Sequence, residues 1–234
     1  MTKLFAFLPF TIILLSLDTK GQMHIGISAD FGNAVEYSGV GSLLKKPATP
    51  SGSIIFFMKE QIDKQWSLQY GGSLGTLGYW IQSSGDADTL STLNDPDFLD
   101  WYSDYRTIYA SGHLVFGRSI INSSRLPKLE LFLGGGFTYY FESQVSQSMI
   151  TCSPSTCQTV FEYEMNRASE NLKGFIDLSI QSYVLPRLLI GLRYRHHFEP
   201  ALEGTYNFYY MVDPPSGNIT LIQRAFSLLC LYEF

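Results

Sequence analysis

Residues 218–234, at the end of the chain, read NITLIQRAFSLLCLYEF, and this stretch decides how the rest is interpreted. Every second residue back from the end belongs to a largely apolar set that finishes in aromatics: Ile222, Arg224, Phe226, Leu228, Cys230, Tyr232 and Phe234. The residues between them are mixed and more polar: Gln223, Ala225, Ser227, Leu229, Leu231 and Glu233. Successive side chains of a β-strand point to opposite faces, so this period of two predicts a strand with one apolar, aromatic face.

Length and composition fit a single β-domain. The chain has 234 residues and a formal charge of -5, and β-barrels of about 200–250 residues commonly form one unit. Tyr 15 and Phe 17 are high counts, and aromatic residues favour strands. Because nucleic-acid binding requires a basic surface, the mild acidity argues against a nucleic-acid partner.

The first 21 residues are expected to be a secretory signal peptide rather than part of the fold. Lys3 precedes an apolar run over residues 4–17, which is shorter than the roughly 20 residues of a transmembrane helix. Small Gly21 predicts cleavage before Gln22, so that residues 22–234 form the mature domain; a retained N-terminal anchor is the alternative. Later apolar runs are also too short for such a helix. Membrane residence would therefore require a closed barrel, in which every backbone polar group finds an internal partner.

Alternation of apolar and polar residues predicts eight strands. They cover residues 23–32, 51–60, 65–75, 105–117, 128 towards 150, 171–182, 188–199 and 218–234. The strand at 51–60 is apolar on both faces, which leaves its register open. Long connections (33–50, 82–104, 142–168, 200–217) alternate with short ones (61–64, 118–127, 184–187). The predicted fold is all-β, an eight-stranded antiparallel up-and-down transmembrane barrel with long outer loops and short periplasmic turns.

The combination of these features resembles the small eight-stranded outer-membrane barrels of the OmpA/OmpX type in Gram-negative bacteria. The resemblance covers residues 22–234 and implies an outer-membrane protein with both termini in the periplasm, surrounded by outer-membrane lipid and monomeric. It also implies that the terminal residues form the assembly signal read by the barrel-insertion machinery: Phe226, Leu228, Tyr232 and Phe234. No peptidoglycan-binding domain follows Phe234, so the wall-anchoring role of larger relatives is not implied.

Charged residues on the inner faces of the predicted strands form the main candidate site. They are Asp30, Glu130, Asp177, Arg193, Arg195, His197, Glu199 and Glu233. Side chains fill the interior of an eight-stranded barrel, and an unpaired buried charge is costly. We therefore expect a structural network of ion pairs that plugs the lumen, with Asp177 paired to Arg193 or Arg195. A gated ion path through this network is the alternative.

Two other patterns could carry chemistry. Ser111 and His113 share an inner face near Glu130 and could imitate a hydrolytic triad, but we expect ordinary lumen residues. His196 and His197 point to opposite faces of a strand, which argues against a shared metal site. The sequence thus predicts no catalytic residues, no metal and no cofactor.

The long loops carry the remaining candidates. Cys152 and Cys157 enclose Ser-Pro-Ser-Thr near the tip of a predicted hairpin, and an exported protein would oxidise them to a disulfide. An acidic loop contains Trp101 and Tyr102, and the last loop contains three tyrosines: Tyr206, Tyr209 and Tyr210. Because aromatics are enriched in binding hot spots, these loops could recognise an extracellular partner, whose identity stays open.

Four functions are compatible with these patterns. We favour a non-enzymatic barrel with a structural or surface-interaction role. A small porin-like channel would need an open lumen, against which the predicted inner residues Phe132, Tyr140 and Phe175 argue. A lipid-modifying barrel enzyme would need a surface Ser/His/acid set. A secreted lipocalin-like binder would show the same alternation with its apolar face turned inward.

Overall fold

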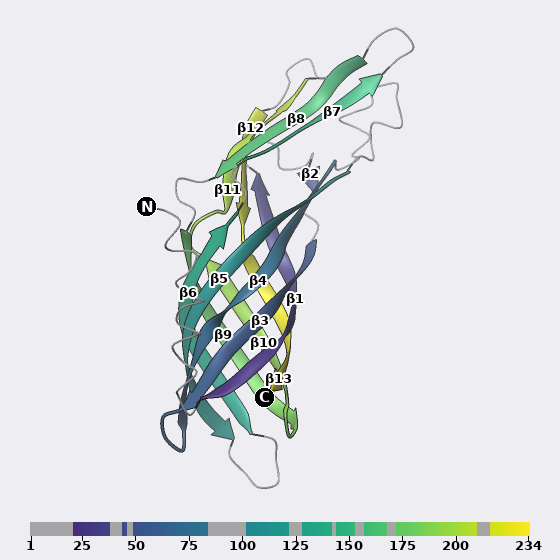
Figure 1. Cartoon of the computed structure of the whole chain (residues 1–234). Coiled ribbons are helices and arrows are strands. Elements are labelled where there is room, and N and C mark those ends of the chain that lie inside the picture. Colours follow the sequence, from purple (N-terminus) through teal and green to yellow (C-terminus); the bar gives the residue numbers. More distant parts are fainter. Residues whose placement is uncertain are drawn as a thin grey trace.

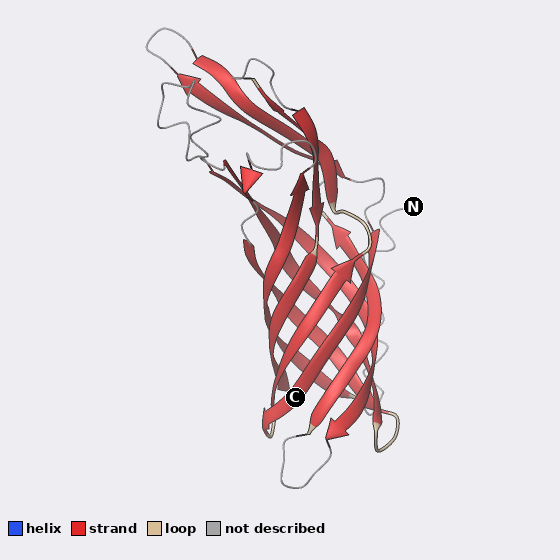
Figure 2. Cartoon of the chain, turned by 180° about the vertical axis from the view of Figure 1, so that it is seen from behind, coloured by secondary structure: helices blue, strands red, loops and turns tan. Residues whose placement is uncertain are grey.

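The structure, a computed structural model, describes residues 21–37, 44–45, 49–83, 102–121, 128–141, 144–152, 157–167, 172–209 and 216–234. All regular elements in these ranges are strands (Figure 2). None of the described residues forms a helix long and apolar enough to cross a membrane.

Eight strands form a closed antiparallel barrel (Figure 1). They are β1 (Gln22–Tyr37), β3 (Thr49–Gln61), β4 (Trp66–Ser83), β5 (Tyr102–Ile121), β6 (Leu129–Tyr140), β9 (Leu172–Leu185), β10 (Leu188–His197) and β13 (Arg224–Glu233). Each strand pairs with the next around the ring, and β1 pairs with both β3 and β13, so the barrel has no free edge. The predicted eight-stranded antiparallel architecture is confirmed.

The two ends of the barrel differ. Short connections join β3 to β4 and β9 to β10 at one end, which we call the turn end. The last strand also finishes there, since the Glu233 amide donates to the Arg187 carbonyl oxygen at 2.9 Å. Figure 1 shows the C-terminus at this end. We call the opposite end the loop end.

The predicted alternation of faces is observed. On β10 the outward Leu192 is 64% exposed, whereas the inward Arg195 is 1% exposed. Ring closure also resolves the strand whose register was open. On β3, Ile54 is 58% exposed and Ile55 is 2% exposed, so Ser53, Ile55, Phe57 and Lys59 face the lumen. The pairing of Ile54 with both Ile27 and Leu74 fixes this choice.

The predicted hairpin with Cys152 and Cys157 near its tip is present at the loop end, and two further strands lie beside it. The strands β7 (Gln144–Cys152), β8 (Cys157–Arg167), β11 (Leu202–Phe208) and β12 (Ser216–Ile222) form a sheet in the order β12, β11, β8, β7. It joins the barrel through residues Ala34 to Tyr37 of β1, which pair with β12. We call these four strands the projecting sheet; Figure 1 shows it extending beyond the loop end. A two-residue strand, β2 (Leu44–Lys45), pairs with β4.

Three predicted boundaries were wrong. The last connection, residues 200–217, contains β11 and the start of β12. The closing strand is interrupted at Gln223, and the fifth strand ends at Tyr140 before β7 begins. These strands extend beyond what the bilayer requires because they pair with one another in the projecting sheet.

Candidate functional site in and around the barrel interior

The outer face of the barrel carries a continuous apolar belt. Its exposed members are Ile25, Ile27, Phe31, Ile54, Leu74, Ile108, Leu114, Phe116, Leu131, Leu133, Phe137, Leu172, Ile176, Leu178, Ile180, Ile190, Leu192, Phe226 and Leu228. An exposed apolar surface of this extent marks an interaction with membrane or protein. Because it encircles a closed barrel, a surrounding bilayer is the environment that it fits.

The belt has the height of a bilayer core. Strand β10 has 10 residues, which at a rise of about 3.3 Å and a tilt of about 45° span roughly 23 Å, against about 25 Å for the apolar band of membrane barrels. Charged outward residues stand at its margins. At the turn end the Arg118 guanidinium lies 5.4 Å from the centre of the Trp66 ring. Arg224 is on the outer face near the loop end, where β13 begins.

The middle of the lumen holds two carboxylates and two guanidinium groups. Arg195 Nη2 donates to Asp177 Oδ2 at 2.9 Å. Arg193 lies near both acids, with Nη2 3.6 Å from Asp30 Oδ1 and Nε 3.9 Å from Asp177 Oδ1. All four side chains are nearly inaccessible to solvent. Asp177, for which a pairing with Arg193 or Arg195 was predicted, contacts both arginines, and the cluster is electrically neutral.

Side chains bridge the lumen between strands that are not neighbours. Arg195 of β10 donates to the hydroxyl of Ser111 of β5 at 3.2 Å. Gln69 of β4 donates to Oε1 of Gln181 of β9 at 3.0 Å. Tyr140 of β6 donates to the side-chain oxygen of Gln223 at 2.9 Å. These bonds join parts of the barrel wall that are not adjacent, so the bonded side chains occupy the lumen between them.

Glycines on the inner face make room for large side chains. A Cβ atom on Gly117 would lie 2.2 Å from the Phe132 ring, and one on Gly136 would lie 2.7 Å from Phe175 Cζ and 2.0 Å from a backbone oxygen. Phe132 and Phe175 are both buried. The lumen is thus packed by complementary large and small residues, as expected for eight strands.

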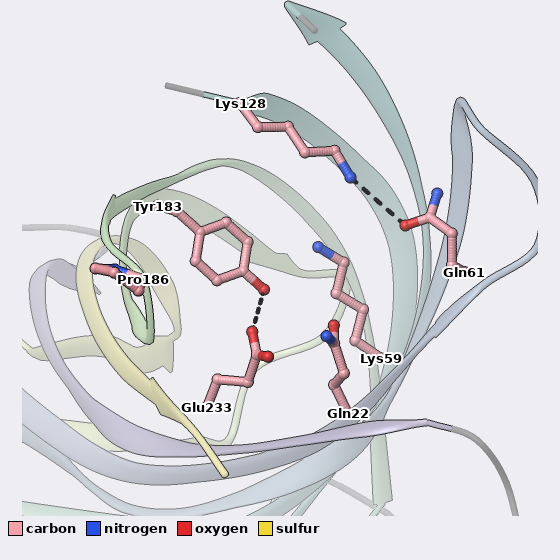
Figure 3. A pocket seen from close by; sticks show the side chains of 7 residues that line it. All are labelled: Gln22, Lys59, Gln61, Lys128, Tyr183, Pro186 and Glu233. Carbon is pink, nitrogen blue, oxygen red and sulfur yellow. Dashed lines mark hydrogen bonds between the residues drawn. The ribbon is translucent and has the colours of Figure 1, made fainter. Parts of the chain in front are cut away.

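A second ionic group closes the turn end. Lys59, which is 3% exposed, pairs with Glu130, and Lys128 Nζ lies 3.0 Å from the other oxygen of Glu130. Opposite them, Tyr183 donates to Glu233 Oε2 at 2.7 Å, and His24 Nε2 lies 3.5 Å from the same oxygen. A pocket of about 480 Å³ lies among them, and it is lined by Gln22, Lys59, Gln61, Lys128, Tyr183, Pro186 and Glu233 (Figure 3).

Two of the predicted lumen charges do not belong to an interior network. Glu199 lies beyond the end of β10, and its side chain is 58% exposed; it accepts a hydrogen bond from Lys173 Nζ at 2.9 Å at the barrel rim. His197 is buried but bonds neutral groups, the Thr138 hydroxyl at 2.8 Å and the Gln223 carbonyl oxygen at 3.2 Å. The strand ends before Glu199, so alternation no longer directs that side chain inward.

The sequence did not single out Lys59 as a lumen charge. It follows Ile55 and Phe57 on the same face of β3, but this strand is apolar on both faces, so its inward set could not be chosen from the pattern. The available clue was Glu130, a predicted inward-facing acid that would need a cationic partner across the lumen. Lys173, which is 1% exposed, was also not predicted to face the lumen. It lies two residues before Phe175, where the predicted inward set of β9 begins.

The Ser111 hydroxyl lies 2.7 Å from that of Ser73 and accepts a hydrogen bond from Arg195. No hydrogen bond between Ser111 and His113 is observed, although both face the lumen. His196 and His197 point to opposite faces, as predicted. No group of three or more potential metal ligands occurs among the described residues.

Residues predicted as the assembly signal lie on the outer face of β13 or just after it. All are exposed: Phe226, Leu228, Tyr232 and Phe234. The Tyr232 and Phe234 rings contact each other, with centroids 5.1 Å apart. Their role in assembly stays a prediction. Strand register places Cys152 opposite Cys157 across β7 and β8, but their side chains, like most of the acidic loop, Trp101 and Tyr210, lie outside the described residues.

The projecting sheet has two chemically different faces. One is buried and aromatic, and its residues pack in a cluster with Leu77, Tyr109 and Tyr140 of the barrel: Phe161, Tyr163, Met165, Leu202, Tyr206, Phe208, Ile219 and Leu221. The other face is polar and carries Glu162, Glu164, Asn166, Glu203, Thr205 and Asn207. Tyr209, just after β11, donates to Glu162 at 3.0 Å, and this bond raises the pKa of Tyr209.

The chain is similar to several solved outer-membrane proteins. The outer membrane protein OprG from Pseudomonas aeruginosa is 8% identical, with 92% of this chain and 96% of that chain covered and a TM-score of 0.47. Ail, the attachment invasion locus protein of Yersinia pestis, in complex with the heparin analogue sucrose octasulfate, is 11% identical, with 92% and 100% covered and a TM-score of 0.38. The outer membrane protease OmpT from Escherichia coli is 8% identical, with 94% and 100% covered and a TM-score of 0.39. No protein-family model and no curated protein matches the sequence.

Proposed function

We propose that this chain is a non-enzymatic integral barrel of the outer membrane that acts through its projecting sheet rather than through its lumen. The observation that carries the proposal is the contrast between two parts of the molecule. Non-neighbouring strands are bonded directly across the lumen, whereas the projecting sheet extends beyond the loop end and exposes a polar face. In this proposal the barrel is an anchor and the sheet contacts an extracellular partner.

The proposed orientation places the turn end in the periplasm and the loop end outside the cell. Barrels of the outer membrane have short periplasmic turns and longer extracellular connections. Here the short connections gather at the turn end, where β1 begins and β13 ends. The proposal includes a cleaved signal peptide, assembly by the barrel-insertion machinery and a monomer in outer-membrane lipid.

Two rival functions find less support. A channel requires a continuous aqueous path, which the cross-lumen hydrogen bonds and the buried Phe132 and Phe175 obstruct. A triad-based hydrolase requires a serine activated by a histidine, whereas Ser111 bonds Ser73 and Arg195 inside the lumen. The barrel interior therefore supports neither the channel nor the hydrolase.

Surface labelling in intact cells tests the orientation. In a background with the native cysteines replaced, Asn207→Cys should react with a membrane-impermeant maleimide, because Asn207 belongs to the projecting sheet. The matched variant Lys64→Cys, in the turn between β3 and β4, should react only after the outer membrane is permeabilised. The reverse pattern would invert the orientation, and recovery of the protein in the soluble periplasmic or culture fraction would contradict the membrane assignment.

Two further measurements test the anchor role. The purified chain should migrate differently in SDS gels with and without boiling, as a folded membrane barrel does. Reconstituted in planar bilayers, it should produce no ion conductance steps above those of the bilayer alone. Reproducible steps from the folded protein would favour the channel instead.

A further inference from the structure

The pocket at the turn end has an arrangement of charged side chains that the packing of the lumen does not explain. Its volume is about 480 Å³, within the range of about 300–1,000 Å³ typical of small-molecule sites. It opens at the turn end, next to the layer that closes the lumen there. Figure 3 shows Lys128 and Gln61 on one side and the Tyr183–Glu233 pair on another, with Lys59 between them.

One wall of the pocket has an excess of positive charge. Lys59 and Lys128 both contact Glu130, so two ammonium groups share a single carboxylate. The side chain of Lys128 is 32% exposed, whereas Glu130 is 2% exposed and lies behind the lysines. Lys128 Nζ also lies 3.5 Å from Gln61 Oε1. The net charge of one unit is therefore presented to the pocket through an accessible amine.

The other wall has negative charge. Glu233 is 18% exposed and is held by contacts to one of its oxygens, Oε2. That oxygen accepts a hydrogen bond from Tyr183 at 2.7 Å and lies 3.5 Å from His24 Nε2. The two contacts fix the carboxylate in place, and Oε1 has no contact among those found for the described residues. The wall can accept a hydrogen bond from a cationic donor.

A ligand with only one sign of charge would leave the opposite wall unpaired while excluding water from it, which is costly. A ligand that carries a carboxylate and an ammonium group satisfies both walls at once. The amide side chain of Gln22 also lines the pocket and matches the hydrogen-bonding groups of a peptide, whereas the Gln61 amide already bonds the Asp63 and Trp66 carbonyl oxygens. We propose that the turn-end pocket binds a zwitterionic amino acid or the zwitterionic end of a short peptide, with its carboxylate at Lys128 and its ammonium group at Glu233.

Calorimetric titration of the folded, full-length chain in detergent micelles tests this proposal. The probes are L-alanyl-L-alanine, its N-acetylated form, which lacks the ammonium group, and its C-terminal amide, which lacks the carboxylate. We expect saturable binding of the dipeptide with a Kd of about 1 mM or tighter, and a loss of at least about tenfold for each blocked form, since each loses a charge-assisted hydrogen bond. Free alanine serves to distinguish the two sources: comparable binding indicates an amino acid, and weaker binding indicates a peptide.

Variants assign the two walls. Lys128→Gln should weaken binding of the dipeptide at least about tenfold and leave binding of its C-terminal amide unchanged. Glu233→Gln should weaken binding of the dipeptide and leave binding of its N-acetylated form unchanged. Lys64→Gln, which removes an exposed lysine of the neighbouring turn, is the matched control and should bind as wild type. An unboiled gel shift verifies that each variant is folded. The proposal is overturned by an absence of saturable heat up to about 10 mM dipeptide, by equal binding of the blocked forms, or by an equal effect of Lys64→Gln.

Discussion

Replacement of Asp177 by Asn tests whether the lumen is a dry plug. The substitution keeps the shape of the side chain and removes one of the two carboxylates that neutralise Arg193 and Arg195 in the middle of the barrel. The buried cluster changes from neutral to a net charge of one positive unit. Asp30 alone then faces two guanidinium groups.

The geometry sets the size of the effect. At the 2.9 Å separation of Arg195 Nη2 and Asp177 Oδ2, the Coulomb attraction is about 6 kcal/mol at an effective dielectric constant of about 20. Asn recovers part of this as a neutral hydrogen bond, so we expect the free energy of unfolding to fall by about 3–5 kcal/mol, the usual cost of removing one partner of a buried ion pair. With an m-value near 3 kcal/mol/M, the urea midpoint moves down by roughly 1–2 M.

The assay is urea unfolding of the barrel in lipid vesicles, followed by tryptophan fluorescence and by the mobility of unboiled samples in SDS gels. Asp177→Asn combined with Arg195→Gln restores neutrality and should be more stable than Asp177→Asn alone. Glu203→Gln on the exposed face of the projecting sheet should change stability by less than about 0.5 kcal/mol. A loss below about 1 kcal/mol for Asp177→Asn would refute the reasoning, because it would mean that water screens the cluster and that the lumen is open.

Three further outcomes are expected. Gly136→Ala should prevent assembly or lower stability by about 1–3 kcal/mol, because its Cβ would overlap the backbone at 2.0 Å, whereas Gly112→Ala, whose Cβ would meet nothing closer than 3.8 Å, should fold normally in the unboiled gel assay. Leu192→Arg, in the apolar belt, should destabilise the barrel in vesicles by about 2–4 kcal/mol; a neutral effect would place that position outside the bilayer. If Cys152 and Cys157 form a disulfide, mass spectrometry after alkylation of the unreduced, denatured chain should show one modified cysteine, and reduction should raise the number to the three present; three without reduction would exclude the disulfide.

The positions of the barrel strands and their inward and outward faces could be predicted because each strand separates two environments. Lipid outside and packed polar groups inside impose a period of two, which residues 218–234 show along most of their length. Where both faces are apolar, as at Ile54 and Ile55, this information is missing, and only pairing with β1 and β4 selected the inward residue. The same limit explains why Lys59 was overlooked.

Partners across the lumen could be predicted only in part. Asp177 and Arg195 lie on adjacent strands, so alternation and strand order together predicted their ion pair. The pairing of Lys59 with Glu130 joins β3 to β6, and the hydrogen bond from Gln69 to Gln181 joins β4 to β9. Such contacts depend on how far the strands are staggered when the sheet closes, which local sequence does not encode.

The sequence by itself determined that this chain forms strands of alternating character, eight of which suffice to span a bilayer, because a period of two is a property of each strand alone. The tertiary structure decided how the chain pairs and packs at the two ends of the barrel. Residues 200–217 contain no clear alternation with a lipid face, yet β11 forms there and pairs with β8 and β12, and it contributes to a buried aromatic cluster. The pocket between Lys128 and Glu233 likewise exists only after β1 meets β13 and closes the ring. Both depend on contacts between residues distant in sequence, whose energies arise only when the barrel has formed.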